Sequence, residues 1–348
     1  MNSKNTTPDM NTETISTLYK QVTGQQHDNI ELLTGSGSNR QYFRMTGIRS
    51  LIAVRGESIA ENRAFIYMAR HFRNKDIPVP EVLAVSDDES CYIQEDLGDT
   101  LLFNAIVNGR TTGVFSDNEK ALIRKSIAIL PSIQFKGAEG MDFGMCYPLS
   151  DFNRRTVMWD LNYFKYCFLK ATGISFNENT LEDDFEAMTD ILLKASSETF
   201  MYRDFQSRNV IIKDEEPYFI DFQGGRKGPV YYDVASFLWQ AKANFNNDLR
   251  EDMIDTYISE ASKFKDIDPA EFRKTLHHFV IFRTMQVLGA YGFRGLFERK
   301  AHFIESIPYA LNNLQTLFKH HLNEYPYLSK LLIQLSEMDI NNITTLKR

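Results

Sequence analysis

The sequence is poor in cysteine, lacks a long apolar run and has no excess of positive charge. Its 348 residues include three cysteines, Cys91, Cys146 and Cys167, without a Cys-x-x-Cys or Cys/His grouping. This pattern argues against zinc and indicates a reducing compartment, so we expect a cytoplasmic protein. No run of about 18 apolar residues occurs and the N-terminus is polar, which predicts neither export nor a membrane-spanning segment.

The charge balance is acidic: 39 Lys and Arg against 46 Asp and Glu give a net charge of −7. Such a chain lacks the general positive field that attracts nucleic acid or anionic lipid, so we expect neither as a partner. The 26 Phe and 16 Tyr supply core material for a folded protein. At about 150 residues per domain the length predicts two packed units, and a monomer is the default.

Two regions of different character follow a polar leader at residues 1–28. Residues 29–96 hold short extended segments and one amphipathic stretch free of Gly and Pro, which predicts a sheet and a helix. In 97–348 amphipathic helical patterns surround one short β segment. Strands are expected at 30–33, 42–45, 51–54, 82–85 and 91–94, and helices at 57–72, 117–136, 151–170, 181–195, 248–263, 269–291, 303–321 and 325–338. We therefore predict an α+β chain with a small antiparallel N-terminal lobe and a larger, mainly helical C-terminal lobe.

The β segment carries three oxygen-bearing side chains at a distinctive spacing. Asp204 and Asn209 lie five residues apart on an expected loop, and Asp221 follows two short apolar strands twelve residues later. If these strands form a hairpin, the three side chains meet. Oxygen ligands suit Mg²⁺, and a remaining carboxylate could accept a proton. Alternatively Asp204 caps a turn and Asp221 ends a strand. The whole combination, preceded by Arg203, favours the functional interpretation.

The loop reads Tyr202-Arg203-Asp204 with Asn209 after it, and the second segment reads Ile220-Asp221-Phe222. This pattern resembles the catalytic loop and metal-binding strand end of protein-kinase-like phosphotransferases, in the branch of aminoglycoside phosphotransferases and choline kinases. Within that branch it is similar to bacterial anomeric sugar kinases of the N-acetylmuramate/N-acetylglucosamine type. The likeness spans roughly residues 30–310, and its further segments are 94–99, 220–223, 228–236 and 283–290.

The resemblance implies an ATP- and Mg²⁺-dependent kinase with a bilobal protein-kinase-like fold. Its small-molecule acceptor would be an amino sugar or a related sugar, phosphorylated at the anomeric hydroxyl. In that interpretation Asp204 is the catalytic base, while Asn209 and Asp221 hold Mg²⁺ against the ATP phosphates. Arg203 and Arg208 flank the base, where each could stabilise charge on the transferred group or form a structural ion pair.

The resemblance places the nucleotide-binding residues in the small lobe. A glycine-bearing loop between two expected strands could lie over the phosphates, although it could also be an ordinary hairpin turn. That loop comprises Gly35, Ser36, Gly37 and Ser38. Gln94 and Asp96 belong to the expected hinge, whose backbone groups would meet adenine, unless the hinge is a plain strand exit. The chain has no Walker or Rossmann glycine motif.

Two positions depart from the kinase pattern. Arg55 ends an expected strand where these kinases carry lysine, and we expect it to bind phosphate and pair with Glu61. Glu57 is a rival partner, and a solvated Arg55 is the alternative. Tyr202 replaces the catalytic-loop histidine, whose space a tyrosine could fill. Neither change removes the base or a metal ligand.

Two other functions remain open. The acceptor could be an aminoglycoside or a choline-like cation, which needs a carboxylate-rich pocket. The acidic residues in 182–186 are candidates for its lining, although they could equally form a solvated helix face. Alternatively the protein is a nucleotide-binding regulatory module that has lost turnover, an idea motivated by Arg55 and Tyr202. Pocket shape in the helical lobe decides the acceptor, and no sequence motif reports that shape.

Overall fold

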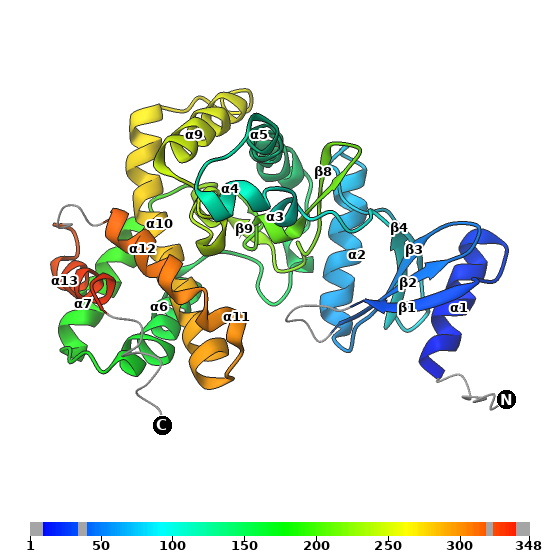
Figure 1. The fold of residues 1–348 in the computed structure, drawn as a ribbon, viewed down its shortest axis with the longest axis horizontal. Helices are drawn as coiled ribbons and strands as arrows, with labels where there is room; N and C mark the ends of the chain where they lie inside the picture. The colour runs from blue at the N-terminus through cyan, green and yellow to red at the C-terminus, as the bar shows by residue number, and fades with distance from the viewer. Residues whose placement is uncertain (1–9, 34–39, 318–322, 339–348) are drawn as a thin grey trace.

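The computed structural model describes residues 10–33, 40–317 and 323–338, which form a small sheet and a larger helical body (Figure 1). The five strands of the sheet run in the order β1-β2-β3-β5-β4, and all neighbours are antiparallel. These strands are β1 (Asn29–Leu33), β2 (Gln41–Thr46), β3 (Leu51–Arg55), β4 (Val82–Val85) and β5 (Cys91–Glu95). The sheet with helices α1 (Met10–Thr23) and α2 (Ile59–Arg73) is called the small lobe, and residues from 101 onward the large lobe.

The sheet buries both of its faces, because successive side chains of a strand point to opposite sides. Leu51 and Ala53 of β3 pack with residues of α1, whereas Ile52 and Val54 pack with residues of α2. Figure 1 shows the sheet between the two helices. The alternation therefore defines an α1 face and an α2 face, and the α2 face is turned toward the large lobe.

Helix α1 was not expected, because residues 1–28 were interpreted as a polar leader. Ile15, Leu18 and Tyr19 are at most 5% exposed and pack on the sheet. The Tyr19 hydroxyl also donates to the backbone oxygen of Arg49 at 2.7 Å. Three apolar positions in a polar stretch are a weak periodic signal, which explains why the sequence analysis missed this helix.

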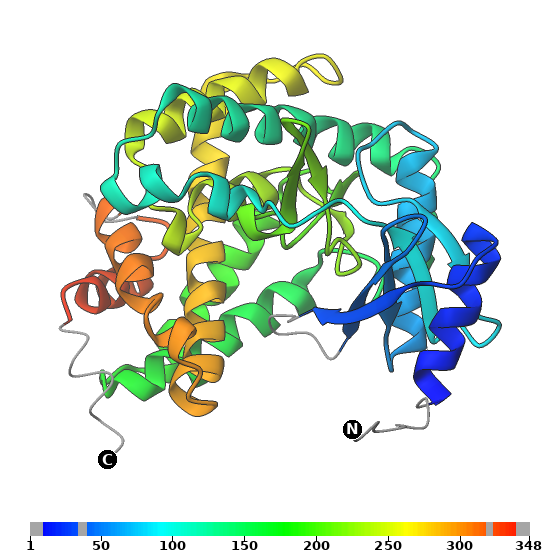
Figure 2. The same cartoon turned by 45° about the vertical axis from the view of Figure 1, so that its right-hand side comes forward.

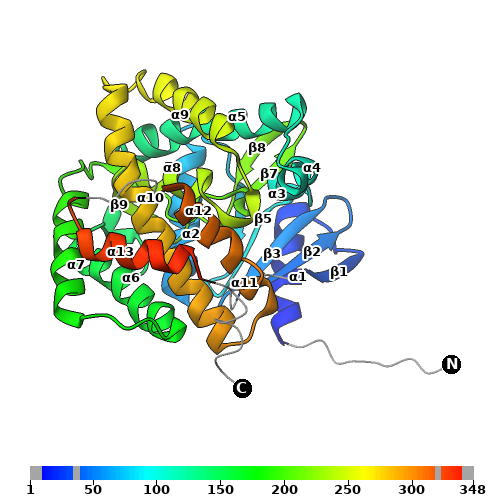
Figure 3. The ribbon, with the colours of Figure 1, turned by 60° about the vertical axis from the view of Figure 1, so that its left-hand side comes forward.

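The large lobe is built around α10 (Pro269–Tyr291), which runs through its middle with α6, α8 and α12 packed against it (Figure 3). Each range that was expected to be helical contains a helix, whereas α3, α4 and α8 were not expected. The helices are α3 (Leu102–Ala105), α4 (Val107–Thr112), α5 (Asp117–Pro131), α6 (Arg154–Cys167), α7 (Glu178–Leu192), α8 (Tyr231–Leu238), α9 (Asn247–Ala261), α11 (Ala301–Ile304), α12 (Ile307–Leu317) and α13 (Pro326–Ser336). Among the residues that the structure describes, no helix is long and apolar enough to cross a membrane.

Two short antiparallel pairs interrupt the helices of the large lobe. Strand β6 (Thr199–Met201) pairs with β9 (Arg226–Gly228), and β7 (Val210–Lys213) pairs with β8 (Glu216–Phe219). The β7–β8 turn consists of Asp214 and Glu215, both with positive φ, as a two-residue hairpin turn of type I′ requires. The hairpin that the sequence predicted between Asn209 and Asp221 is therefore present.

Aromatic side chains join the two lobes. Phe65 of α2 stacks on Phe222 at 4.8 Å between ring centroids, and Phe72 meets Phe200 and Phe222 edge-on at 5.1 and 5.4 Å. Figure 2 shows α2 beside the large lobe, with the chain crossing between the lobes near residue 100. Such aromatic pairs add about 0.5–1.5 kcal/mol each beyond their burial. The exact division at 29–96 and 97–348 stays a prediction.

The contribution of α1 can be measured with two matched leucine variants. Leu18, on the side of α1 that packs on the sheet, is 5% exposed, whereas Leu32 on β1 is 57% exposed. We expect Leu18→Ala to lower the free energy of unfolding by about 2–5 kcal/mol because it leaves a cavity. Leu32→Ala should change it by about 0.5 kcal/mol or less. Urea denaturation of the full chain measures both values, and equal values would contradict the packing of α1.

Candidate active site

The catalytic-loop segment and the β7–β8 hairpin bring the three predicted side chains together. Asn209 uses its amide nitrogen twice, donating to the backbone oxygen of Asp204 at 2.8 Å and to the Asp221 carboxylate at 3.4 Å. The Ile220 amide donates to the Asn209 carbonyl at 3.0 Å, which closes the base of the hairpin. Asp204, Asn209 and Asp221 therefore meet at one place, and the amide oxygen of Asn209 is left as a possible oxygen ligand.

The backbone is strained at two residues of this site. Arg203 and Asp221 have φ values of 74° and 67°, in the left-handed region that residues with a side chain rarely adopt. Each such residue costs about 1–3 kcal/mol and persists only where the surroundings impose it. Because both strained residues lie at the predicted centre, the conformation supports a functional role for the loop.

A buried carboxylate imposes the loop conformation. Asp233 of α8 is 0% exposed and accepts the backbone amides of Tyr202 and Arg203 at 2.9 Å each. The side chain of Gln134 donates to it at 2.9 Å as well. Burial raises the pKa of Asp233 to about 7, although these three hydrogen bonds lower it. The guanidinium of Arg203 lies 3.4 Å from Asp160 instead, so Arg203 forms a structural ion pair.

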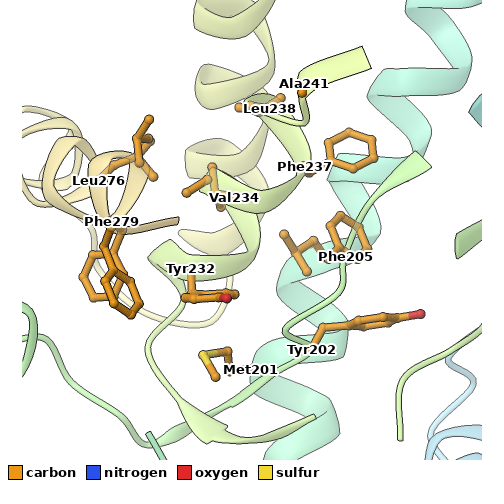
Figure 4. Packing of buried hydrophobic residues seen from close by; sticks show 14 of the residues in the cluster. Met201, Tyr202, Phe205, Tyr232, Val234, Phe237, Leu238, Ala241, Leu276 and Phe279 are labelled. Atoms are coloured by element: carbon orange, nitrogen blue, oxygen red, sulfur yellow. The ribbon is translucent and has the colours of Figure 1, made fainter. Parts of the chain in front are cut away.

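Tyr202, which departs from the histidine of the resembled pattern, performs a structural task. Its hydroxyl donates to the backbone oxygen of Ile220, the residue before Asp221. Its ring meets Phe205 and Phe222 edge-on at 5.4 and 6.3 Å. Figure 4 shows Tyr202 and Phe205 beside the buried residues of α8. The tyrosine thus ties the loop that carries Asp204 to the segment that carries Asp221.

The Asp204 carboxylate is accessible, as its side chain is 49% exposed. The guanidinium of Arg283 on α10 lies 3.8 Å from it. Arg208 stacks on the ring of Phe103 at 3.8 Å and is itself exposed. Arg208 is also the residue at which two cavities meet, since it lines both.

The first cavity is a cleft of about 380 Å³ between the lobes, with Asn209 and Asp221 at one side. Its remaining lining comes mainly from the sheet and the hinge, and includes Tyr42, Ile52, Phe65, Gln94, Asp96 and Leu97. The second cavity holds about 220 Å³ within the large lobe and includes Arg208 and Arg283. Asp204 itself lines neither cavity, but Arg283 of the second cavity lies 3.8 Å from its carboxylate, and Asn209 of the first cavity donates to its backbone oxygen.

The hinge residues line the cleft, but the side chain of Asp96 is occupied. It accepts Arg44 Nε at 2.8 Å, the Ser50 hydroxyl at 2.6 Å and the Gly98 amide at 2.9 Å. The Asp96 carboxylate therefore fixes the hinge, and its hydrogen bonds are made to the protein itself. Gln94 is 8% exposed and lines the cleft, and its amide oxygen is buried without a hydrogen-bond partner among the described residues.

The expected pair of Arg55 and Glu61 is not formed. Arg55 continues the series of Leu51 and Ala53, which face α1, and its guanidinium lies 3.4 Å from the Gln41 side chain. Glu61 pairs with Arg40 at 3.3 Å. The alternation of side chains along β3 explains the correction, because it turns position 55 away from the cleft. Gly35, Ser36, Gly37 and Ser38 lie outside the described residues.

The side chains around Asp221 fit a hard cation. Burial raises the pKa of Asp221, and the neighbouring Asp204 carboxylate raises it further, so the site has a local excess of negative charge. The Gln223 side chain donates to Asp221 at 2.8 Å, while its own oxygen is buried without a partner among the described residues. Among those described residues, no group of three or more His, Cys, Asp or Glu is arranged so that it could hold a metal ion. Mg²⁺ needs only one or two carboxylates, because substrate phosphates complete its shell.

Sequence comparison identifies the family. The profile of the phosphotransferase enzyme family, APH, matches residues 29–272. The chain belongs to this family. Two curated relatives, from Neisseria meningitidis serogroup B and Pseudomonas aeruginosa, are both N-acetylmuramate/N-acetylglucosamine kinases and 26% identical to this phosphotransferase. The matches cover 74% of the chain and 76% of the Neisseria protein, and 59% of the chain and 58% of the Pseudomonas protein.

Solved structures share the fold of this phosphotransferase. APH(2")-IIia in complex with GDP and kanamycin has a TM-score of 0.59 at 12% identity, covering 88% of this chain and 99% of that one. The choline kinase LicA from Streptococcus pneumoniae has the same TM-score and identity, covering 90% and 100%. The predicted family and the bilobal α+β fold are confirmed. The phosphotransferase is a small-molecule kinase.

The hydroxyl of Tyr202 provides a test of the loop connection. Tyr202→Phe keeps the ring contacts but removes the donor to the Ile220 carbonyl. We expect the free energy of unfolding to fall by about 1 kcal/mol, the typical worth of such a hydrogen bond. Tyr309→Phe is the control, because Tyr309 is 43% exposed. Denaturant melts of both variants measure the difference, and an unchanged Tyr202→Phe would show that the hydrogen bond contributes nothing.

Proposed function

We propose that this phosphotransferase is an ATP- and Mg²⁺-dependent kinase that phosphorylates the anomeric hydroxyl of an amino sugar. The observation that carries the proposal is the meeting of Asp204, Asn209 and Asp221, of which Asn209 and Asp221 line the interlobe cleft, while Arg283 of the large-lobe cavity lies 3.8 Å from Asp204. The curated relatives carry the names of amino sugar kinases, which supports the acceptor class. A structural neighbour, the amicoumacin kinase hAmiN, is solved in complex with AMP-PNP, which supports ATP as the donor. The widely spaced cysteines support a cytoplasmic location.

The proposed chemistry needs little from the protein beyond orientation and charge. The hydroxyl oxygen of the acceptor bonds to the γ-phosphorus while the bond between that phosphorus and the ADP leaving group breaks. Asp204 accepts the proton that the hydroxyl releases. Its half-exposed carboxylate can reach an acceptor, and Arg283 lies beside it. Asn209 and Asp221 would hold Mg²⁺, which when bound neutralises charge on the phosphates. Arg203 acts on the loop conformation, and Arg208 lies at the junction of the two cavities.

The charge of the large-lobe cavity favours a neutral or anionic acceptor. Its wall contains Arg208, Lys242 and Arg283, and no Asp or Glu is among the described residues that line it. An aminoglycoside or a choline-like cation would meet these cations in the wall, and the nearest carboxylates are already paired: Asp204 lies 3.8 Å from Arg283, and Glu305 lies 2.9 Å from Lys242. A sugar can instead accept hydrogen bonds from these cations through its hydroxyl and acetamido oxygens. The cavity therefore supports the amino sugar over the cationic acceptors.

Three of the four acidic residues at 182–186, which the cationic alternative would use, are engaged elsewhere, and the fourth, Asp183, is exposed on α7. Glu182 pairs with Lys165, and Glu186 pairs with Arg154. Asp184 accepts the backbone amide of Leu328 at 2.7 Å, at the start of α13. These carboxylates stabilise the packing of the large lobe, and none lines either of the two cavities.

The test of the proposal is phosphoryl transfer from ATP to a panel of acceptors in the presence of Mg²⁺. We expect ADP release with N-acetylated amino sugars, and Asp204→Asn should lower kcat by about two to four orders of magnitude because the base is lost. Asp248→Asn is the matched control, since Asp248 is an exposed residue of α9 and lines neither cavity. The melting temperature should rise with ATP in both variants.

The outcomes separate the alternatives. Transfer to kanamycin or choline but to no sugar would favour the cationic acceptor. A melting temperature that rises with ATP while no acceptor stimulates ADP release would favour a regulatory module. Equal kcat values for Asp204→Asn and Asp248→Asn would contradict the role of Asp204.

A further inference from the structure

Arg40 is a buried cation of the small lobe, next to the strand whose side chains line the cleft. Position 40 directly precedes β2, and the even-numbered positions of β2 share one face. Tyr42 and Arg44 of that face line the cleft. Arg44 forms ion pairs with Asp96 at 2.8 Å and with Asp99 at 2.7 Å, so its charge is neutralised by the hinge carboxylates. Arg40 extends the same series toward α2.

Arg40 is held against α2 by Glu61. Its side chain is 2% exposed, and its Nη2 atom lies 3.3 Å from the Glu61 carboxylate and donates to the Glu61 backbone oxygen at 3.1 Å. Burial lowers the pKa of Arg40, but Tyr92, Tyr42 and Glu61 raise it more, so the pKa lies above its ordinary value. A buried, charged guanidinium thus fixes the first turn of α2.

Glu61 connects this arginine to the candidate metal ligand. The Gln223 side-chain nitrogen lies 3.4 Å from the Glu61 carboxylate and donates to the Asp221 carboxylate at 2.8 Å. A continuous polar chain therefore runs from β2 through α2 to Asp221.

We propose that Arg40 is a positioning residue of the phosphotransfer site, which orients Asp221 through Glu61 and Gln223 and replaces the Arg55 that the sequence suggested. The inference rests on the proposed function, because Asp221 matters only if the site holds Mg²⁺ and a nucleotide. The physical basis is that partners behind a metal ligand set its orientation and basicity, and their loss typically costs about 10–100-fold in metal affinity or activity.

The test is ADP binding by calorimetry to the full chain, with and without Mg²⁺. We expect Arg40→Gln to lose about tenfold or more of the affinity for ADP with Mg²⁺, while affinity without Mg²⁺ changes less. Arg40→Lys should recover part of the loss because it restores the charge. Arg55→Gln is the matched control on the opposite face of the sheet, and its affinities should stay within about twofold of wild type, as for other surface substitutions.

A double variant separates positioning from stability. Arg40→Gln alone leaves Glu61 facing the buried end of β2 without its partner and should lower the melting temperature. In Arg40→Gln/Glu61→Gln both charges are gone, so the melting temperature should recover while the Mg²⁺-dependent gain in ADP affinity stays lost.

The inference would be overturned if Arg40→Gln kept the wild-type gain in affinity with Mg²⁺, or if Arg55→Gln lost it. Recovery of that gain in the double variant would also overturn it, because the effect of Arg40 would then be on stability alone. Failure of the proposed function gives a different result: the wild-type chain itself would not bind ADP with or without Mg²⁺.

Discussion

The site depends on one buried carboxylate. Asp233 has no exposed surface. It accepts hydrogen bonds from the consecutive backbone amides of Tyr202 and Arg203 and from the side-chain amide of Gln134. A buried acceptor with three donors is favourable only while every bond is made, because each donor left alone costs about 1–3 kcal/mol. That condition fixes the backbone of Tyr202 and Arg203, including the left-handed conformation of Arg203, and it sets the direction in which the next residue, Asp204, projects.

The second element of the site is held by the hairpin and by α2. Tyr202 and Asn209 tie the loop to the segment around Asp221, and Phe222 anchors that segment against α2. The same helix carries Glu61, so the small lobe reaches the Asp221 carboxylate both by packing and by a polar chain. Asp204, Asn209 and Asp221 all belong to the large lobe, but the cleft beside them is lined by both lobes. Such connections keep the two walls of the cleft in register, which matters because phosphoryl transfer tolerates little misplacement of the reacting groups.

The sequence predicted what depends on short-range spacing. Asp204, Asn209 and Asp221 are close along the chain, and the apolar strands between them signal a hairpin, so their meeting followed from local pattern. The partner of Glu61 was predicted wrongly, because the choice of Arg55 came from a resemblance and not from the alternation along β3. The series of positions 40, 42 and 44 carried the correct signal. Helix α1 was missed because three buried side chains in a polar stretch barely differ from a surface segment.

The aromatic stack between Phe65 and Phe222 makes the hydrophobic core continuous from the sheet into the helical body. If one lobe unfolded, the aromatic rings of the other lobe would lose their packing partners and become exposed to water. Denaturation is consequently a shared event in which both halves lose order together. A mutation far out in the helices can then abolish nucleotide affinity simply by lowering the population of intact molecules.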